Sequence, residues 1–409
     1  MAKVDVDKSY NLIKDLLVET PCIFSPWLSH ATHAKVYLKL ENFNKTGSFK
    51  DRGVASFLLS HNNENIKHVI AASAGNHAQA VAFYAQKMGI KASIFMPRMT
   101  PNNKVFQTKR FNAEVILSGE NYDESFIAAK EFASVHKAHY IHAYNDLDII
   151  AGQGSVGLEI IKQGIRPDIV FVPVGGGGLI AGMASYFAQK NLKIKTIGVE
   201  AKNFESMAVA LKKGFPYMLN AKKSIAEGIA VRMVGEFTYA ICADLALEMM
   251  HVSDEQIQSA IMFLLEKQKI IAEGAGAAGV AGLLSLSEQE NIVNKTIVVV
   301  ISGGNIDLSL LARLSNQELI KTSRLYKFSL TISDTPGSLS NLLILVSNGL
   351  ANIIDIQHER VFAKLYWNEV LVNLTVEIRD EEHLKTLLDM LNKEGYKVRN
   401  YSLGNFSCL

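Results

Sequence analysis

The chain has 409 residues, of which 42 are Lys or Arg and 40 are Asp or Glu, so its formal net charge is only +2. This length allows two or three domains, and the balanced charge without a basic cluster argues against nucleic acid or an anionic membrane as a partner. The cysteines are few, odd in number and lack metal-ligand spacing: Cys22, Cys242 and Cys408. This usage, together with the absence of an apolar signal segment in residues 1–17, favours a soluble protein of the reducing cytoplasm.

The first informative motif is Thr46-Gly47-Ser48-Phe49-Lys50, which leads into a helical stretch at residues 53–59. A lysine taken alone is most often a solvated surface charge. Here an aromatic residue, small residues and hydroxyls precede Lys50, and a helix start follows it. An amine desolvated at such a place loses its proton more readily and can attack a carbonyl carbon.

Short apolar strand candidates then alternate with longer helical patterns. The expected strands are 36–40, 68–72, 92–96, 114–117, 140–142, 169–174, 196–200 and 296–301, with helices such as 78–88 and 122–134 between them. This alternation is typical of an α/β fold with mostly parallel sheets that helices cover on both faces.

The segment Ser73-Ala74-Gly75-Asn76-His77 lies between an expected strand and an expected helix. A loop of small residues that leads into a helix N-terminus can bind an anion, and the α-carboxylate of an amino acid would suit it. A simple helix cap by Ser73 or Asn76 is the alternative, although a capping loop can also receive a ligand. We interpret His77 as a packed or hydrogen-bonding residue rather than a catalytic base.

Four consecutive glycines, Gly175, Gly176, Gly177 and Gly178, join the expected strand to an apolar helix at residues 179–188. Glycines let a ligand approach the main chain, and the helix start adds free N–H groups and a positive dipole end. A flexible loop tip would not usually connect two strongly apolar elements. The motif therefore predicts a phosphate site, although it is neither the dinucleotide fingerprint nor a P-loop.

A reactive lysine and a phosphate site together point to pyridoxal 5'-phosphate, held as a Schiff base. With the fourth motif Ser302-Gly303-Gly304-Asn305, residues 22–310 resemble the fold-type II pyridoxal-phosphate enzymes, which are similar to tryptophan synthase β, and within them the threonine/serine dehydratases. The resemblance implies two lobes with the cofactor between them, the smaller one at about residues 45–145. It also implies the cofactor contacts: Lys50 at the aldehyde, Phe49 at the ring, Asn76 at the phenolic oxygen, Gly175 to Gly178 at the phosphate and Ser302 at the pyridine nitrogen.

The resemblance further implies a lyase that converts L-threonine to 2-oxobutanoate and ammonia, and also L-serine to pyruvate. Lys50 would remove the α-proton as a general base, and the β-hydroxyl would leave as water. A neutral hydroxyl at Ser302 does not enforce a protonated pyridine ring, which favours prompt elimination over transamination. The substrate would lie against the loop residues Ser73, Ala74, Gly75 and His77.

Several alternatives stay open. A serine racemase-like isomerase needs a proton donor at position 74, where this chain has Ala74. The metal site of the relatives looks incomplete, because Glu200 is followed by Ser206 instead of a carboxylate, and no metal is expected unless Glu205 contributes. Glu273, before a glycine- and alanine-rich helix start, is either functional or a favourable first-turn acid.

The C-terminal region is expected to form a separate domain at residues 326–405, after a catalytic domain at 1–315 and a linker or connecting helix at 316–325. Its expected βαββαβ order is 326–332, 339–350, 353–358, 370–378, 381–391 and 396–401. With the turn Asp334-Thr335-Pro336-Gly337, this order resembles the ACT domain, which implies an amino-acid effector such as isoleucine or valine. A domain used only for dimerisation is the alternative.

Together these interpretations predict a cytoplasmic, allosteric homodimer or homotetramer of amino-acid metabolism, in isoleucine biosynthesis or in threonine breakdown. A non-catalytic amino-acid sensor is the second hypothesis, but the retention of Lys50, Asn76, the four glycines and Ser302 argues against a decayed catalytic lobe.

Overall fold

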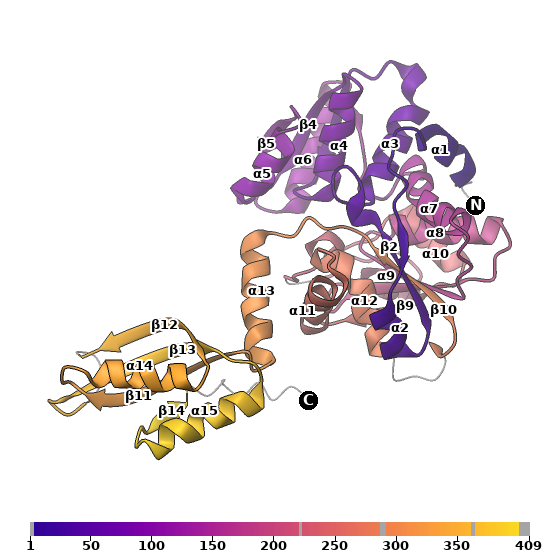
Figure 1. The fold of residues 1–409 in the computed structure, drawn as a ribbon. Coiled ribbons are helices and arrows are strands. Elements are labelled where there is room, and N and C mark those ends of the chain that lie inside the picture. The colour runs from indigo at the N-terminus through magenta and orange to yellow at the C-terminus, as the bar shows by residue number, and fades with distance from the viewer. Residues whose placement is uncertain (1–3, 221–222, 287–291, 361–364, 401–409) are drawn as a thin grey trace. The chain divides into compact units, whose positions relative to one another are not determined.

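The computed structural model describes residues 4–220, 223–286, 292–360 and 365–400, and the chain divides into two compact units, Met1–Ile306 and Asp307–Leu409 (Figure 1). Cys408 and the end of the expected last strand lie outside the described residues. Within the described parts of the chain, no helix has the length and apolar character needed to span a membrane.

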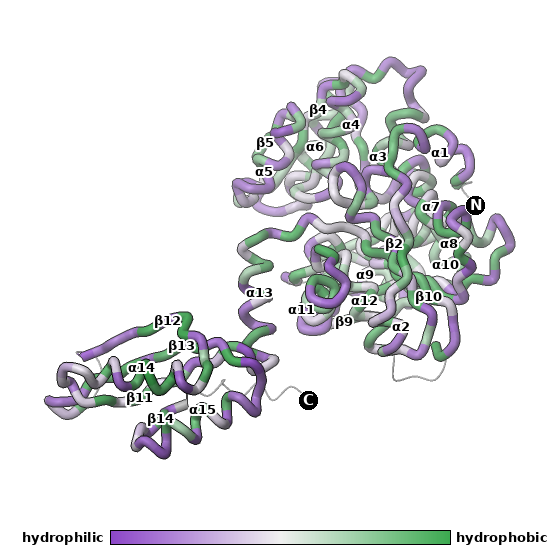
Figure 2. The backbone as a smooth tube through the Cα atoms, viewed as in Figure 1, coloured by the Kyte–Doolittle hydropathy of each residue, from purple (hydrophilic) through white to green (hydrophobic). Residues whose placement is uncertain are grey.

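The larger sheet of the first unit has six strands in the order β1-β2-β10-β7-β8-β9. All neighbouring pairs are parallel except β1 and β2. The central strand β10 is hydrophobic along its length (Figure 2) and brings the residues after position 301 beside those after position 40. Its strands are β1 (Cys22–Phe24), β2 (Lys35–Leu40), β7 (Ile169–Pro173), β8 (Lys195–Ala201), β9 (Glu248–Val252) and β10 (Thr296–Ile301).

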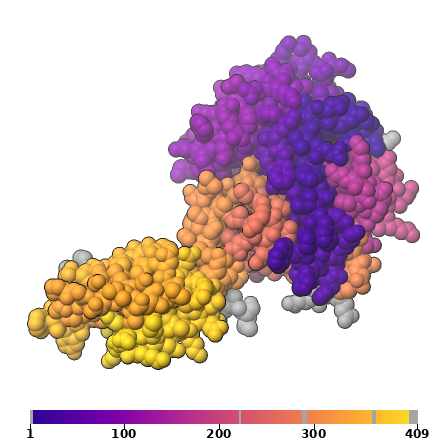
Figure 3. Space-filling model, viewed as in Figure 1, coloured from indigo at the N-terminus to yellow at the C-terminus, as the bar shows by residue number. Residues whose placement is uncertain are grey.

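The second sheet is fully parallel, in the order β5-β4-β3-β6. Its strands are β3 (His68–Ala72), β4 (Lys91–Met96), β5 (Glu114–Leu117) and β6 (His139–Tyr140). The N-terminal residues, indigo in Figure 3, run along one face of the first unit and supply β1 and β2 to the larger sheet. The expected α/β architecture with mostly parallel sheets is confirmed.

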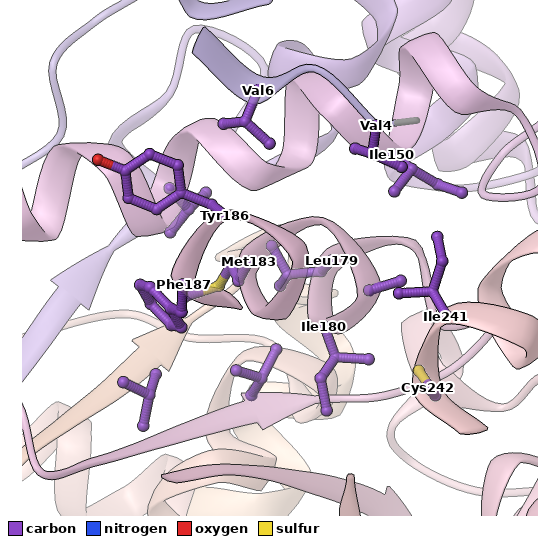
Figure 4. Packing of buried hydrophobic residues seen from close by; sticks show 14 of the residues in the cluster. Val4, Val6, Ile150, Leu179, Ile180, Met183, Tyr186, Phe187, Ile241 and Cys242 are labelled. Carbon is purple, nitrogen blue, oxygen red and sulfur yellow. The ribbon is translucent and has the colours of Figure 1, made fainter. Parts of the chain in front are cut away.

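Helices cover both sheets. In the first unit they are α1 (Val6–Ile13), α2 (Pro26–Thr32), α3 (Lys50–Ser60), α4 (Asn76–Lys87), α5 (Asn102–Lys109), α6 (Tyr122–Val135), α7 (Leu147–Lys162), α8 (Gly178–Gln189), α9 (Ser206–Lys213), α10 (Glu236–Asp244), α11 (Asp254–Phe263) and α12 (Gly274–Leu286). Short turns of helix are η1 (Glu41–Phe43), η2 (Asn62–Glu64), η3 (Glu227–Ile229) and η4 (Leu264–Gln268). Helix α8 is buried on nearly all sides, and Figure 4 shows its side chains Leu179, Ile180 and Met183 in the apolar core.

The second unit is an antiparallel sheet with two helices on its apolar face. The strand order is β12-β13-β11-β14, and every pair is antiparallel. Its elements are α13 (Leu308–Lys321), β11 (Leu325–Ser333), α14 (Ser338–Asn348), β12 (Asn352–Glu359), β13 (Glu369–Glu377), α15 (Glu381–Lys393) and β14 (Val398–Asn400). From β11 onward this is the expected βαββαβ order of an ACT-like fold, and the segment read as a linker at 316–325 falls mostly in α13.

Three elements differ from the sequence-based expectations. Strand β6 ends at Tyr140, because the chain turns after it and the His142 ring accepts hydrogen bonds from the backbone N–H groups of Tyr144 and Asn145. Strand β1 was missed because it has only three residues. Strand β9 was missed because its sequence, Glu-Met-Met-His-Val, has a single β-branched residue.

A buried network of two cations and two carboxylates joins α3 to the rest of the first unit. The Arg52 guanidinium contacts Glu41 at 2.6 and 2.9 Å and Glu159 at 2.7 Å through two nitrogens. The Lys39 amine lies 2.7 Å from the same Glu159 carboxylate. All four side chains are almost wholly inaccessible to solvent. Because each charge has partners, the network tolerates a place in the interior where an unpaired charge could not remain.

We predict that Arg52→Ala lowers the free energy of unfolding by about 3–5 kcal/mol, because two buried carboxylates lose their main partner. Urea unfolding followed by circular dichroism measures this change. The control is Lys190→Ala, which removes an exposed pair with Asp7 and should leave the midpoint close to that of the wild type. Equal midpoints for both variants would contradict the assigned importance of the network.

Candidate active site

Lys50 is the first residue of α3, and its side chain is partly buried. Its Nζ donates a hydrogen bond to the Ala143 carbonyl oxygen at 2.7 Å and lies 4.9 Å from the centre of the Phe49 ring. Burial lowers the pKa of the Lys50 amine to about 8, although the nearby Glu273 carboxylate raises it. The positive end of the helix dipole also disfavours the charged form. A useful fraction of the amine is therefore neutral near pH 7 to 8.

The motif that carries Lys50 is bound to the residues that follow β10. Ser48 and Gly303 form a β-bridge, and the Phe49 backbone N–H donates to the Ser302 carbonyl at 3.0 Å. The Gly304 N–H donates to the Gly47 carbonyl at 2.9 Å. These bonds hold two segments together that are about 250 residues apart, and they place buried Ser302 beside Phe49.

The four glycines form a tight loop between β7 and α8 in which side chains are excluded. A Cβ atom on Gly176 would overlap the Tyr144 ring, and one on Gly175 would lie 2.9 Å from the Ile229 Cα. Gly177 has a φ of +91°, a backbone conformation that favours glycine, and no side chain caps the α8 N-terminus. The loop and the helix start therefore present backbone N–H groups suited to a phosphate.

Asn76 begins α4 and contacts both Glu273 and Asn305. Its Nδ2 donates to Glu273 Oε1 at 2.5 Å, and its Oδ1 accepts from Asn305 Nδ2 at 2.8 Å. Burial raises the pKa of Glu273 to about 7, against the hydrogen bond from Asn76. Glu273 interacts electrostatically with Lys50 and accepts a hydrogen bond from Asn76, so the three side chains lie in one site.

The loop before α4 is ordered by its own polar groups. The Ser73 hydroxyl accepts from the Gly75 N–H at 3.2 Å, while Ala74 and Gly75 are partly exposed. The His77 Nε2 lies 2.9 Å from the Ile141 carbonyl, and burial lowers the pKa of this ring to about 3. His77 is therefore neutral, hydrogen-bonded and packed, in accordance with its interpretation from the sequence.

The segment 142–145 is a part of the site that the sequence analysis missed. Ala143 accepts from Lys50, and the Tyr144 ring lies against Gly176 while its hydroxyl donates to the Met233 carbonyl at 3.0 Å. The segment thus connects the lysine to the glycine loop. Its position after the end of a parallel strand was the available signal, because sites in α/β folds gather at those ends.

Glu200 serves as a cap for α9 in this structure. Its carboxylate accepts from the backbone N–H groups of Met207 and Ala208 at 2.7 and 3.0 Å, and burial raises its pKa to about 8. Ser206 is buried beside it. Across the residues with described positions, no group of three or more His, Cys, Asp or Glu side chains could hold a metal ion.

The side chains and loops of this site fit a phosphate-bearing aldehyde such as pyridoxal phosphate. A partly neutral lysine amine can bond the aldehyde carbon, and the glycine loop, which has no room for side chains, offers backbone N–H groups to a phosphate. The oriented carboxamide of Asn76 offers a donor for an oxygen on the ring.

Comparison with known proteins agrees with this chemistry. A family model described as "Pyridoxal-phosphate dependent enzyme" matches residues 13–303. An L-threonine ammonia-lyase of Thermotoga maritima is 39% identical over 396 residues, which is 97% of this chain and 98% of that protein.

Two solved structures are similar to this chain in fold. The processed form of threonine deaminase isoform 2 from Solanum lycopersicum has a TM-score of 0.71 and 35% identity, and covers 76% of this chain and 94% of its own. Maize serine racemase has a TM-score of 0.72 and 30% identity, and covers 77% of this chain and 97% of its own.

We predict that the Lys50 amine of the cofactor-free protein titrates with a midpoint near pH 8, because burial opposes its charged form. The rate of acetylation of Lys50, measured by peptide mass spectrometry across pH 6–11, should reach half its maximum there. Exposed Lys193 in the same sample serves as the reference for reagent reactivity. A Lys50 midpoint at the ordinary lysine value of 10.5 would contradict the assignment.

Proposed function

The chain belongs to the family of pyridoxal-phosphate-dependent enzymes and deaminates L-threonine, and from this premise we propose which residues carry the reaction. The observation that carries the proposal is the convergence of the Lys50 amine and the glycine loop on the single segment Ala143–Tyr144. A lysine and a phosphate cradle connected in this way can hold the two ends of one small cofactor.

Pyridoxal phosphate, when bound, supplies a ring that withdraws negative charge from the α-carbon of an amino acid. We assign its phosphate to the N–H groups of the glycine loop, Gly175 to Gly178. Asn76 would donate to its phenolic oxygen, Ser302 would face its pyridine nitrogen, and Phe49 would flank its ring.

Lys50 has two roles in this proposal. Its amine would hold the cofactor through the aldehyde carbon, and it would be freed when a substrate amine takes that place. The freed Lys50 takes the α-proton as general base, for which a pKa near the working pH is favourable. The loop of Ser73, Ala74 and Gly75, with His77 packed behind it, receives the substrate carboxylate at the start of α4.

Elimination is favoured over racemisation at this site. A racemase needs a second proton donor on the face opposite Lys50, and the methyl group of Ala74 cannot supply a proton. We therefore propose L-threonine and L-serine as substrates of a lyase, with no appreciable formation of D-serine. Measured formation of D-serine at a rate comparable with pyruvate would support the isomerase instead.

We also propose that the second unit is regulatory. Its ACT-like sheet carries a cavity of about 320 Å³ beside the turn at residues 334–337, with His358 and Arg360 among its lining residues. The Arg360 guanidinium holds the Asp334 carboxylate through two hydrogen bonds of 2.8 and 2.9 Å. A cation and a turn of backbone N–H groups can recognise an amino acid, so we propose an effector such as isoleucine or valine.

Three further proposals concern organisation. We propose a catalytic domain at 1–315 and a regulatory domain at 326–405, with a homodimer or homotetramer as the working form, since ACT-like folds are used in pairs. We propose a cytoplasmic location, which the free thiols of Cys22 and Cys242 support.

We predict that Lys50→Ala abolishes the visible absorbance that the protein keeps after incubation with pyridoxal phosphate and removal of the free cofactor by gel filtration, and lowers the turnover of L-threonine at least about 10³-fold. Absorbance spectra and the release of 2-oxobutanoate measure the two effects. Lys45→Ala, an exposed lysine in the same motif, is the control and should keep both. Full activity in Lys50→Ala would overturn the proposed function.

We predict that isoleucine or valine shifts the threonine saturation curve of the full chain, and that a chain ending at Arg324 turns over threonine without this response. Steady-state rates with and without each effector measure the shift. In the full chain, Arg360→Ala should weaken the response while Lys385→Ala, on the exposed surface of α15, should not. An unchanged response in the shortened chain would leave the second unit with an architectural role only.

A further inference from the structure

A line of hydrogen bonds crosses the site and joins Asn76 to Asn305 and Glu273, two residues to which the proposed reaction gives no role. Asn305 Nδ2 donates to the Thr46 carbonyl at 2.7 Å and to Asn76 Oδ1 at 2.8 Å. Asn76 Nδ2 in turn donates to Glu273 Oε1 at 2.5 Å. The line joins four parts of the first unit that are distant in sequence: the lysine motif, the segment after β10, the start of α4 and the residue before α12.

The direction of these bonds follows from chemistry alone. A backbone carbonyl can only accept, so the Thr46 oxygen requires that Asn305 present its NH₂ group. That NH₂ group in turn requires the oxygen of Asn76, which leaves the Asn76 NH₂ group to face Glu273. A flipped Asn76 amide would place its oxygen against the Glu273 carboxylate and its NH₂ group against that of Asn305, so both bonds would be lost.

Two glycines keep room for the side chains of this line. A Cβ on Gly303 would overlap Glu273 Oε1 and would lie 3.2 Å from Asn76 Nδ2. A Cβ on Gly47, which has a φ of +81°, would lie 2.6 Å from Asn305 Oδ1. The same glycines come from the motifs around Lys50 and Ser302, so the space is built by the residues that assemble the site.

The charged groups around Glu273 are Lys50, Lys104 and Glu227. Lys50 and Lys104 favour its carboxylate form, whereas Glu227 and burial oppose it. Lys104 and Glu227 form an ion pair with each other between α5 and η3. Among the described residues, Asn76 is the side chain that forms a hydrogen bond with Glu273. The Glu273 carboxylate also raises the pKa of the Lys50 amine.

We propose that Glu273 is a positioning residue which, with Asn305, holds the Asn76 carboxamide in a single orientation and leaves its second N–H for the cofactor. The proposal rests on the assignment of Asn76 to the phenolic oxygen. Glu273 acts through Asn76, because it accepts a hydrogen bond from one of the two N–H groups of that amide. Loss of this bond would leave the amide free to rotate. Its carboxylate also raises the pKa of the Lys50 amine, against the larger lowering by burial.

The test compares Glu273→Ala, Glu273→Gln and Asn305→Ala by the dissociation constant of pyridoxal phosphate, measured by fluorescence titration. Loss of a hydrogen bond to a charged acceptor is worth about 1.5–3 kcal/mol, so Glu273→Ala should weaken binding about 10- to 100-fold. Glu273→Gln should recover most of this loss, since its amide oxygen accepts the same bond. Asn305→Ala should weaken binding in the same direction as Glu273→Ala.

Two further readouts separate positioning from a general structural role. In an Asn76→Ala background, Glu273→Ala should cause no additional loss of cofactor affinity. In the cofactor-free protein, Glu273→Gln should lower the pH midpoint of Lys50 acetylation, because the carboxylate raises the pKa of that amine. The remote control Glu248→Ala, which loses an exposed pair with Lys195, should change neither quantity.

Wild-type affinity in Glu273→Ala, or an equal loss in the Asn76→Ala background, would overturn the proposal. Either result would leave the proposed function standing, because that function is judged by the absorbance and turnover lost in Lys50→Ala. If the absorbance persists in Lys50→Ala, the function fails whatever Glu273 does.

Discussion

The burial of the Arg52 guanidinium is the constraint on which the first unit depends. A charge without water must be paired, and its partners Glu41 and Glu159 come from η1 and α7. Because Lys39 shares Glu159, the larger sheet is tied to the same point. The first turn of α3 is thus held from several sides. Lys50 lies in the same turn, two residues before Arg52, so its backbone position is fixed as well.

Several contacts restrict the position of Lys50 and of the segments around it. Backbone bonds to the residues after β10 fix the motif in front of it, and Ala143 accepts from its amine. The Tyr144 ring fills the space beside the glycine loop that a side chain there would need. Because these contacts are made within the protein itself, they fix the relative positions of the groups, and fixed positions are what precise proton transfer requires.

Patterns of neighbouring residues predicted the strands that consist of a distinct apolar run between loop residues. Strand β3 was expected at the residues where it lies, because five apolar or β-tolerant residues are bounded by loop signals on both sides. Strand β9 and the turn after Tyr140 escaped prediction, because a methionine pair and a histidine carry no distinctive periodicity. Tyr144 escaped as a site residue, and Asn305 received no role although it belongs to the fourth motif, for a related reason: their partners lie 32 to 259 positions away.

By itself the sequence predicted the α/β class and the separate C-terminal fold, and it singled out Lys50 and the four glycines as candidate site residues, since each of these signals depends on residues close together in the chain. The tertiary structure alone decided that Arg52 is buried and paired, that Tyr144 covers the glycine loop, and that Glu273 faces Asn76. The physical reason is that burial, pairing and the direction of a hydrogen bond are properties of contacts between distant segments. No local spacing of residue types encodes such contacts.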